Sequence, residues 1–314
     1  MCIEYSNNAM RELTVGKLTY RSSTRLNDKQ YINKYLETLN LRMKIGECIE
    51  VFFESKDQRR IRIFNKYMSP FSYIFYAIDF ILNRVFSKWS ATQKIYYFIT
   101  KGRNRVLSVP EVLGRIVSCG FKILDFEKSG SLTYVLAEKF GEPAFNMSPT
   151  YGALVHLNRV GYGGKLFKVY KFRTMYPFSE YIQQYMYGRN ELQEGGKIAD
   201  DFRVTSYGRL MRKFWIDELP MFYNLFRGEM KLVGVRPLSQ HFFSLYPSDM
   251  QSLRTRTRPG LVPPFYADLP KTLDEVIESE RVYLEKYLIN PLKTDWIYFW
   301  RAVYNILFRR ARSN

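Results

Sequence analysis

Two neighbouring carboxylates, Asp217 and Glu218, lie in a strongly basic part of the chain. Residues 208–238 read GRLMRKFWIDELPMFYNLFRGEMKLVGVRPL, so Arg212 precedes the two acids and Arg236 follows them. An ionised aspartate can attack phosphorus as a nucleophile. A carboxylate beside it can hold Mg²⁺ together with phosphate oxygens. The spacing therefore predicts a metal-assisted phosphoryl-transfer site.

Asp217 also has a structural interpretation. The sequence PMFYNLFRG predicts a helix that begins at Pro220 and ends at Gly228. Proline is tolerated in a first helical turn, and an acid just ahead of it is a common N-cap. A capping carboxylate is kept ionised by the helix dipole, so the cap and the nucleophile remain compatible interpretations.

A second cluster spans residues 159–175, RVGYGGKLFKVYKFRTM. Its glycines predict a turn, and FKVYKF alternates as a strand that places Lys171 and Arg173 on one face. This pair could bind phosphates, although a solvated edge strand would give the same pattern. The glycines match neither a P-loop nor a dinucleotide-binding motif, which excludes those two modes of phosphate binding.

Together, the two clusters closely resemble the bacterial sugar transferase family, the monotopic polyprenyl-phosphate phosphoglycosyl transferases, over about residues 149–308. The resemblance implies a small α/β membrane-associated enzyme that uses Mg²⁺. Its reaction would move a phosphosugar from a nucleotide diphosphate sugar, with a UDP-sugar as first candidate, to undecaprenyl phosphate. The implied route is a covalent aspartyl-phosphosugar intermediate, and the reaction would initiate assembly of exopolysaccharide, capsule or O-antigen.

The family motifs also imply roles for individual residues. The D-E-L-P motif assigns the nucleophile to Asp217 and the Mg²⁺-associated carboxylate to Glu218. Substrate-binding positions carried over from the family are Lys171, Arg173, Arg212, Arg236, Arg258 and Glu280. Three departures are visible: V-R-P replaces P-R-P, VPPFYAD replaces T-G-x-x-Q, and Glu280 stands where the family usually has aspartate. These departures suggest a different sugar or acceptor specificity.

The first half of the chain predicts a separate α/β scaffold domain. We expect domains at residues 1–140 and 141–314, joined by a linker that begins GEPAFNMSP. A strand at 47–55, a helix at 110–118 and a hairpin of 121–127 with 132–140 are predicted. The run at 108–139 resembles the closing part of a class I methyltransferase sheet, which implies a truncated Rossmann-like scaffold. No glycine-rich turn follows an early strand, so a cofactor site of that kind is not expected.

Composition restricts the partners. The chain has 314 residues with 48 Lys+Arg against 30 Asp+Glu, a net charge of +18 that is shared by both halves. Such a charge favours anionic partners, namely nucleic acid, an anionic membrane surface or phosphorylated substrates. Because no nucleic-acid recognition motif is present, nucleic acid is not expected. Three scattered cysteines favour a reducing, cytoplasmic compartment.

The re-entrant membrane helix that usually precedes the first family motif is not recognisable here, and no stretch is long and apolar enough to span a bilayer. Residues 59–105 combine ten Lys/Arg, one acid and twelve aromatics. They predict either amphipathic helices with solvated basic faces or a surface that rests on lipid headgroups. The C-terminal helix WIYFWRAVYNILFRR could likewise pack on the core or bind lipid.

These features predict a cytoplasmic protein held peripherally on the inner face of the cytoplasmic membrane. Two further possibilities remain, a homodimer and a membrane-protein partner that supplies the contact with the membrane. A different class of function also stays open, a catalytically silent scaffold or regulatory relative in a polysaccharide assembly complex.

Overall fold

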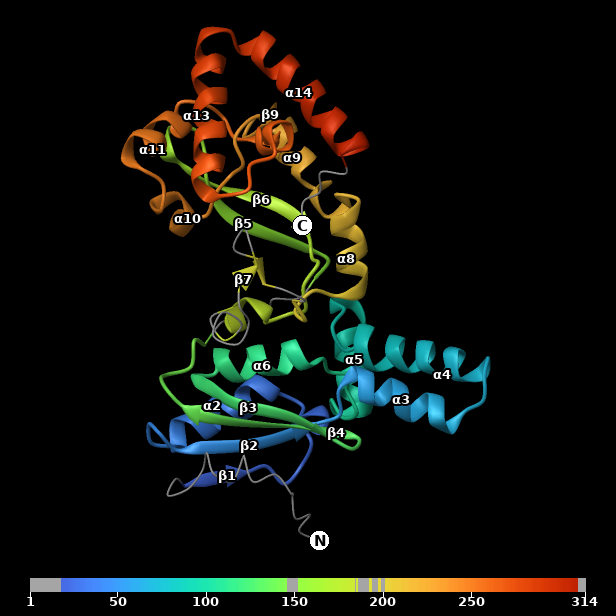
Figure 1. The fold of residues 1–314 in the computed structure, drawn as a ribbon. Helices are drawn as coiled ribbons and strands as arrows, with labels where there is room; N and C mark the ends of the chain where they lie inside the picture. Colours follow the sequence, from blue (N-terminus) through green and yellow to red (C-terminus); the bar gives the residue numbers. More distant parts are fainter. Residues whose placement is uncertain are drawn as a thin grey trace. The chain divides into compact units, whose positions relative to one another are not determined.

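The computed structural model describes residues 18–145, 152–183, 185, 192–193, 197–198 and 201–309 (Figure 1). The chain forms two compact units. Unit 1 comprises Met1–Gly152 and Tyr176–Arg189, and unit 2 comprises Ala153–Met175 and Asn190–Asn314. The units therefore divide later than the boundary expected between residues 140 and 141, and one short segment of the second half returns to unit 1.

Unit 1 contains a four-stranded mixed sheet in the order β1-β2-β4-β3. Strand β2 pairs in parallel with β1, whereas the β2–β4 and β3–β4 pairs are antiparallel. The strands are β1 (Thr19–Arg21), β2 (Cys48–Phe53), β3 (Phe121–Ser129) and β4 (Leu132–Lys139). The predicted strand, hairpin and mixed α/β class are confirmed. The truncated Rossmann-like description stays a prediction.

Helices cover and extend this sheet. They are α2 (Ile32–Arg42), α3 (Lys56–Lys66), α4 (Phe71–Phe80), α5 (Ser90–Thr100) and α6 (Val109–Ser118), with the shorter η1 (Leu26–Asp28), π-helical η2 (Ile81–Val85) and η4 (Ser179–Ile182). Helix α3 begins with a capping box, in which Ser55 and Gln58 each accept from the other's backbone N–H. Three helices within 59–105 are thus confirmed.

Helix α6 lies on β3 and β4, where it is almost entirely buried (Figure 1). Pro110 lies in its first turn, and Gly120, at φ +84°, follows its end, as predicted. The segment that returns to unit 1 packs on this helix. A Cβ atom at Gly114 would lie 2.0 Å from the Phe178 carbonyl oxygen, and the Arg115 guanidinium lies 4.4 Å from the Phe178 ring centroid.

Unit 2 begins with the antiparallel pair β5 (Leu154–Val160) and β6 (Leu166–Phe172), joined by a turn that contains η3 (Tyr162–Gly164). Helix α9 (Met221–Phe226) packs on β6. The buried Asn224 side chain fixes this contact, because it donates to the Lys168 carbonyl at 2.7 Å and accepts from the Tyr170 N–H at 3.1 Å. The predicted strand and the predicted helix ending before Gly228 are confirmed.

The remaining elements of unit 2 include those that contribute to its main core. They are β7 (Leu192–Gln193), β8 (Lys197–Ile198), α8 (Ser206–Lys213), η5 (Ile216–Glu218), β9 (Lys231–Val233), α10 (Gln240–Ser244), α11 (Ser248–Thr255), β10 (Gly260–Val262), α12 (Phe265–Asp268), α13 (Leu273–Ile289) and α14 (Pro291–Phe308). Strands β9 and β10 are parallel neighbours. The buried core residues are Val233, Val235, Tyr246, Met250, Ala267, Tyr283, Leu284 and Tyr298.

The C-terminal helix α14 packs on the core with one face only. Tyr298, Ala302 and Asn305 are buried, whereas Trp296 and Trp300 are exposed on the other side. Over the described residues, no helix combines the length and the apolar character that crossing a bilayer requires.

Candidate active site

The turn that carries the two carboxylates is η5, a short 3-10 helix between α8 and α9. Trp215, directly before it, has a left-handed backbone (φ 53°), and its indole N–H donates to the Tyr266 hydroxyl at 2.9 Å. Asp217 is buried within the turn, and Pro220 occupies the N-terminus of α9. The prediction that Asp217 caps α9 is therefore wrong, because η5 separates the carboxylate from that helix.

Glu218 is held by a cation from the hairpin. Its Oε1 accepts from Lys171 Nζ at 2.6 Å and lies 3.6 Å from Arg236 Nη2. Lys171 reaches it from β6, near the end of the strand. The two sequence clusters, which are separated by 47 positions at this contact, thus meet in one site. The structure brings Lys171, Glu218 and Arg236 together as the motifs predicted.

The pKa of Asp217 is raised, chiefly because burial disfavours its charged form, and the adjacent Glu218 adds to the increase. Lys171 and Arg212 act in the opposite direction. Burial also lowers the pKa of Lys171, although Glu218 opposes that change. Asp217 is therefore a poorly hydrated carboxylate whose charged form is favoured by nearby cations.

Arg212 lies in the last turn of α8, and its Nε donates to Thr174 Oγ1 at 3.0 Å. Thr205 caps the start of α8 by accepting from the Gly208 N–H, and it also donates to the Thr174 carbonyl. Gly208 permits this close approach, because a Cβ atom there would lie 2.1 Å from the same carbonyl oxygen. Thr174, two residues past the end of β6, thus contacts both ends of the helix that presents Arg212.

Three further charged residues belong to this cluster and were missed by the sequence interpretation. Asp201 and Arg203 form a bidentate pair, with Nε and Nη2 contacts of 2.8 and 2.7 Å. Burial is the main reason why the pKa of Arg212 is lowered. Asp201 raises this pKa, and Arg203 lowers it further. Burial together with Arg236 lowers the pKa of Arg159 on β5. Asp201 and Arg203 lie in the segment DDFRVT, which carries no recognised motif, and Arg159 begins the cluster at 159–175 but was assigned no role.

Arg173 lies just past β6, half-buried, and its backbone N–H donates to the Ala153 carbonyl at 2.6 Å. Arg258 is exposed near the end of α9, where its Nη1 would lie 3.5 Å from a Cβ atom at Gly228. No contact of the Arg173 or Arg258 side chain with Asp217 or Glu218 was found among the described residues. A substrate role for both arginines stays a prediction.

Glu280 is buried, and it forms an ion pair with the equally buried Arg254. Arg254 Nη2 also donates to the Arg236 carbonyl at 2.5 Å. Burial raises the pKa of Glu280, and Arg254 opposes this shift. Glu280 thus contacts other protein groups, and Arg254 links it to the backbone of Arg236 at the site. Its predicted contact with substrate stays a prediction.

The donor atoms around Asp217 and Glu218 fit a hard divalent cation, because Mg²⁺ prefers one or two carboxylates with phosphate oxygens. Within the described residues, no group of three or more His, Cys, Asp or Glu side chains could hold a metal ion. The two acids would therefore hold Mg²⁺ together with oxygen ligands from water or a substrate. Lys171 and Arg236 would compete with the metal for Glu218 Oε1.

The family model for bacterial sugar transferases matches residues 144–309. The galactosyl transferase CpsE of Streptococcus agalactiae is 34% identical over 141 residues, which are 44% of this chain and 31% of that protein. The undecaprenyl-phosphate galactose phosphotransferase of Salmonella typhimurium is 31% identical over 159 residues, which are 49% of this chain and 31% of that protein.

A third relative has a name that includes its donor. The UDP-N-acetylgalactosamine-undecaprenyl-phosphate N-acetylgalactosaminephosphotransferase of Aeromonas hydrophila is 39% identical over 106 residues, 33% of this chain and 23% of that protein. The matched region thus spans a third or less of each of these three relatives. The family match at 144–309 includes Lys171, Arg212, Asp217, Glu218 and Arg236. Because the family model matches more than half of its residues, the chain belongs to the bacterial sugar transferase family.

Proposed function

We propose that this protein is a phosphoglycosyl transferase that moves a phosphosugar from a UDP-sugar to undecaprenyl phosphate and so initiates glycan assembly. The observation that carries the proposal is the buried carboxylate of Asp217 beside Lys171, Glu218 and Arg212. The names of two relatives, which specify undecaprenyl phosphate, support the acceptor. The name of one of them supports the donor.

The first step uses Asp217 as the nucleophile. One carboxylate oxygen attacks the sugar-bearing phosphorus of the donor. A new P–O bond forms, and the bridging P–O bond of the diphosphate breaks. The leaving uridine monophosphate takes the electron pair. Lys171, Arg212 and Arg236 would bind the diphosphate and stabilise the negative charge that develops on the phosphoryl oxygens.

The second step regenerates the enzyme. A phosphate oxygen of the polyprenyl carrier attacks the same phosphorus, and the bond between Asp217 and phosphorus breaks. The carboxylate is restored, and the product is a lipid-linked diphosphate sugar. Mg²⁺, which Glu218 would hold together with diphosphate oxygens, would supply neutralisation of charge on the donor.

The test is Asp217→Asn, assayed for release of uridine monophosphate from a panel of UDP-sugars with undecaprenyl phosphate. We expect turnover to fall by at least about a thousandfold, because loss of a nucleophile removes the covalent route. Intact-protein mass spectrometry of the wild type, with donor and without acceptor, should detect one added phosphosugar. The same measurement on Asp217→Asn should detect none.

The matched control is Asp249→Asn, an exposed carboxylate on α11 that pairs with Arg281. Its turnover should equal that of the wild type. Undiminished turnover in Asp217→Asn would exclude the nucleophilic role. A wild type that releases no nucleotide from any donor would favour the catalytically silent scaffold.

A further inference from the structure

Helix α4 has a distribution of polarity opposite to that of an ordinary surface helix. It continues directly into the π-helical segment η2, so the two form one rod from Phe71 to Val85. A row of large apolar side chains recurs along it at helical spacing, and every residue in this row is exposed, whereas Phe80 outside the row is half-buried. These residues, here called the α4 apolar face, are Phe71, Ile74, Phe75, Ile78, Ile81, Leu82 and Val85.

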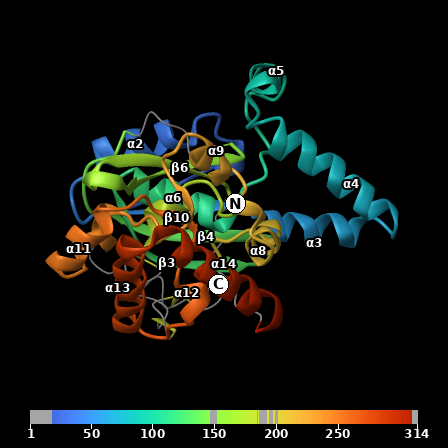
Figure 2. The same ribbon diagram turned by 90° about the horizontal axis from the view of Figure 1, so that it is seen from above.

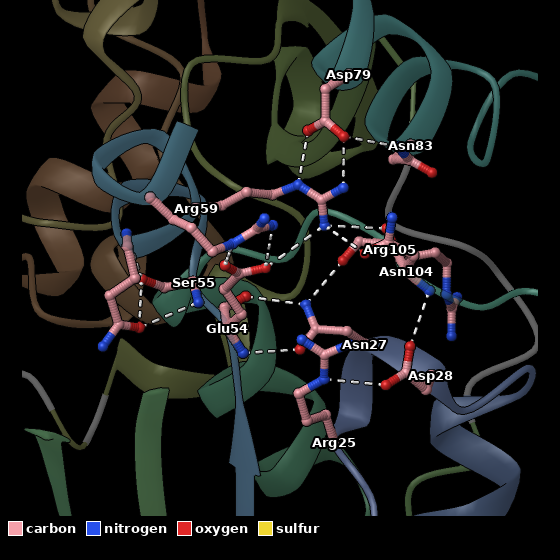
Figure 3. Close-up of polar contacts among 12 residues, drawn as sticks. Arg25, Asn27, Asp28, Glu54, Ser55, Arg59, Asp79, Asn83, Asn104 and Arg105 are labelled. Atoms are coloured by element: carbon pink, nitrogen blue, oxygen red, sulfur yellow. Dashed lines mark hydrogen bonds and ion pairs between the residues drawn. The ribbon is translucent and has the colours of Figure 1, made fainter. Parts of the chain in front are cut away.

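The polar side chains of the same rod point inward (Figure 3). Asp79 accepts from Arg59 Nε at 2.6 Å and from Arg59 Nη2 at 2.5 Å, and Asn83 donates to the same carboxylate at 2.9 Å. Arg59, on α3, is only 1% exposed, and it also donates to the Asn104 carbonyl at 3.1 Å. Ser72 is buried on this side as well.

In water, a surface helix turns its apolar stripe toward the core and its polar face outward. The rod does the reverse, and the Arg59–Asp79 pair holds it in that orientation. Helices α3 and α4 pack on each other and project from the sheet of unit 1 in both views (Figures 1 and 2). An apolar face displayed in this way indicates an apolar partner.

Charge around the α4 apolar face favours a lipid surface as that partner. Exposed cations lie on both sides of it along the chain, at Arg60, Lys66, Lys94, Lys101 and Arg103. Asp79 is the one acid between residues 59 and 105, and its carboxylate is paired with Arg59. The surroundings are thus complementary to anionic headgroups.

Aromatic residues and length agree with binding in the plane of the membrane. Tyr73 and Trp89 are exposed close to the two ends of the rod, where amphipathic rings suit the membrane interface. Phe98 on α5, 86% exposed, is a further large apolar side chain that the surface of unit 1 displays. The 10 residues of α4 and 5 of η2 extend at most about 22 Å, short of the roughly 30 Å hydrocarbon core.

We propose that the α4 apolar face inserts into the interfacial layer of an anionic lipid bilayer, with the Arg59–Asp79 pair on its protein side. This surface lies outside the residues matched to the family, and the inference does not depend on the role of Asp217. Its failure and the failure of the proposed function are therefore distinguishable, because vesicle binding is measured without substrate.

The local test uses an environment-sensitive fluorophore, NBD, on a single cysteine in the full chain. Ile78→Cys reports on the α4 apolar face, and Ile45→Cys, at a 75% exposed position before β2, is the matched control. Both carry Cys2→Ser, and native Cys48 and Cys119 are buried. Vesicles of phosphatidylcholine with 30% phosphatidylglycerol should shift the Ile78→Cys emission to the blue and at least double its intensity. The Ile45→Cys signal should stay constant.

The binding test compares flotation of the wild type, Ile74→Asp/Ile78→Asp and Ile45→Asp with the same vesicles. The double variant should bind at least about tenfold more weakly, since a charge in the membrane costs more than 1.4 kcal/mol. Ile45→Asp should bind like the wild type, and circular dichroism should show all three folded. Equal binding by the double variant, or an unresponsive NBD group at position 78, would overturn the proposal. A blue shift that rises with protein concentration alone would assign the face to a second copy of the chain.

Discussion

Lys231 places a partly buried ammonium group beside the core of unit 2. Its Nζ donates to the Tyr283 hydroxyl at 2.8 Å, lies 3.1 Å from both carboxylate oxygens of Asp295 and lies 3.1 Å from the Tyr287 ring centroid. Burial lowers the pKa of Lys231 to about 8, and Asp295 opposes the change. The charged form therefore costs free energy in the folded protein at neutral pH.

This cost predicts a pH-dependent stability. Between about pH 8 and the ordinary value of 10.5, the unfolded chain retains a proton that the folded protein has lost. The contribution of Lys231 to the free energy of unfolding should therefore rise with pH in this window. In urea unfolding, the free energy of unfolding of the wild type should increase between pH 7 and pH 10 by about 1 kcal/mol relative to that of Lys231→Met, allowing for solvent screening.

The exposed Lys286→Met on α13 is the matched control for that series and should follow the wild type. If the free energies of unfolding of the wild type and Lys231→Met differed by the same amount at every pH from 7 to 10, the pH dependence could not be assigned to Lys231.

At the residue scale, the sequence predicted the site where motifs were contiguous. Asp217, Glu218, Lys171 and Arg236 lie in two recognisable clusters, and the structure brings them together. Arg159 begins the cluster at 159–175, but it was assigned no role, because its interaction with Arg236 arises only when the chain folds.

At the element scale, helix α8 depends on a glycine for its position. Gly208→Ala would ordinarily stabilise an exposed helix by about 1 kcal/mol. Here the added methyl group would meet the Thr174 carbonyl, so we expect destabilisation by about 2 kcal/mol instead. The displaced helix should also misplace Arg212 and lower kcat/KM for the sugar nucleotide.

Thermal unfolding and steady-state kinetics would measure both effects. Ser206→Ala, an exposed position on the same helix, should change neither. A Gly208→Ala protein as stable as the wild type would show that β6 does not restrict the approach of α8.

Elements with local signals were predictable, and their orientation was not. The hairpin β3–β4, helix α6 and helix α14 follow from periodicity and from their turn residues, such as Gly120 and Gly130. The outward apolar face of α4 could not be inferred from periodicity. Its orientation is fixed by Arg59, which lies 20 residues before Asp79.

At the scale of the whole molecule, the net charge of +18 should make membrane binding sensitive to salt. The Debye length falls from about 10 Å at 0.1 M salt to about 3 Å at 1 M, which screens attraction to anionic headgroups. Flotation with the anionic vesicles should therefore weaken at least about tenfold between 0.05 and 0.5 M NaCl. Vesicles of phosphatidylcholine alone supply the reference, and their weaker binding should change little. If binding to anionic vesicles did not depend on salt, electrostatic attraction would be excluded as its cause.

The segment Tyr176–Arg189 has a consequence for how this protein can be divided. The chain leaves unit 1 after Gly152, comes back for these residues and leaves again, so three points of the backbone join the units. A gene fragment that encodes only the family match at 144–309 would carry Phe178 and Ile182 without the α6 surface that buries them. The transferase region is thus continuous in sequence but not as a folded body, and an exchange of modules at residue 144 would divide a core.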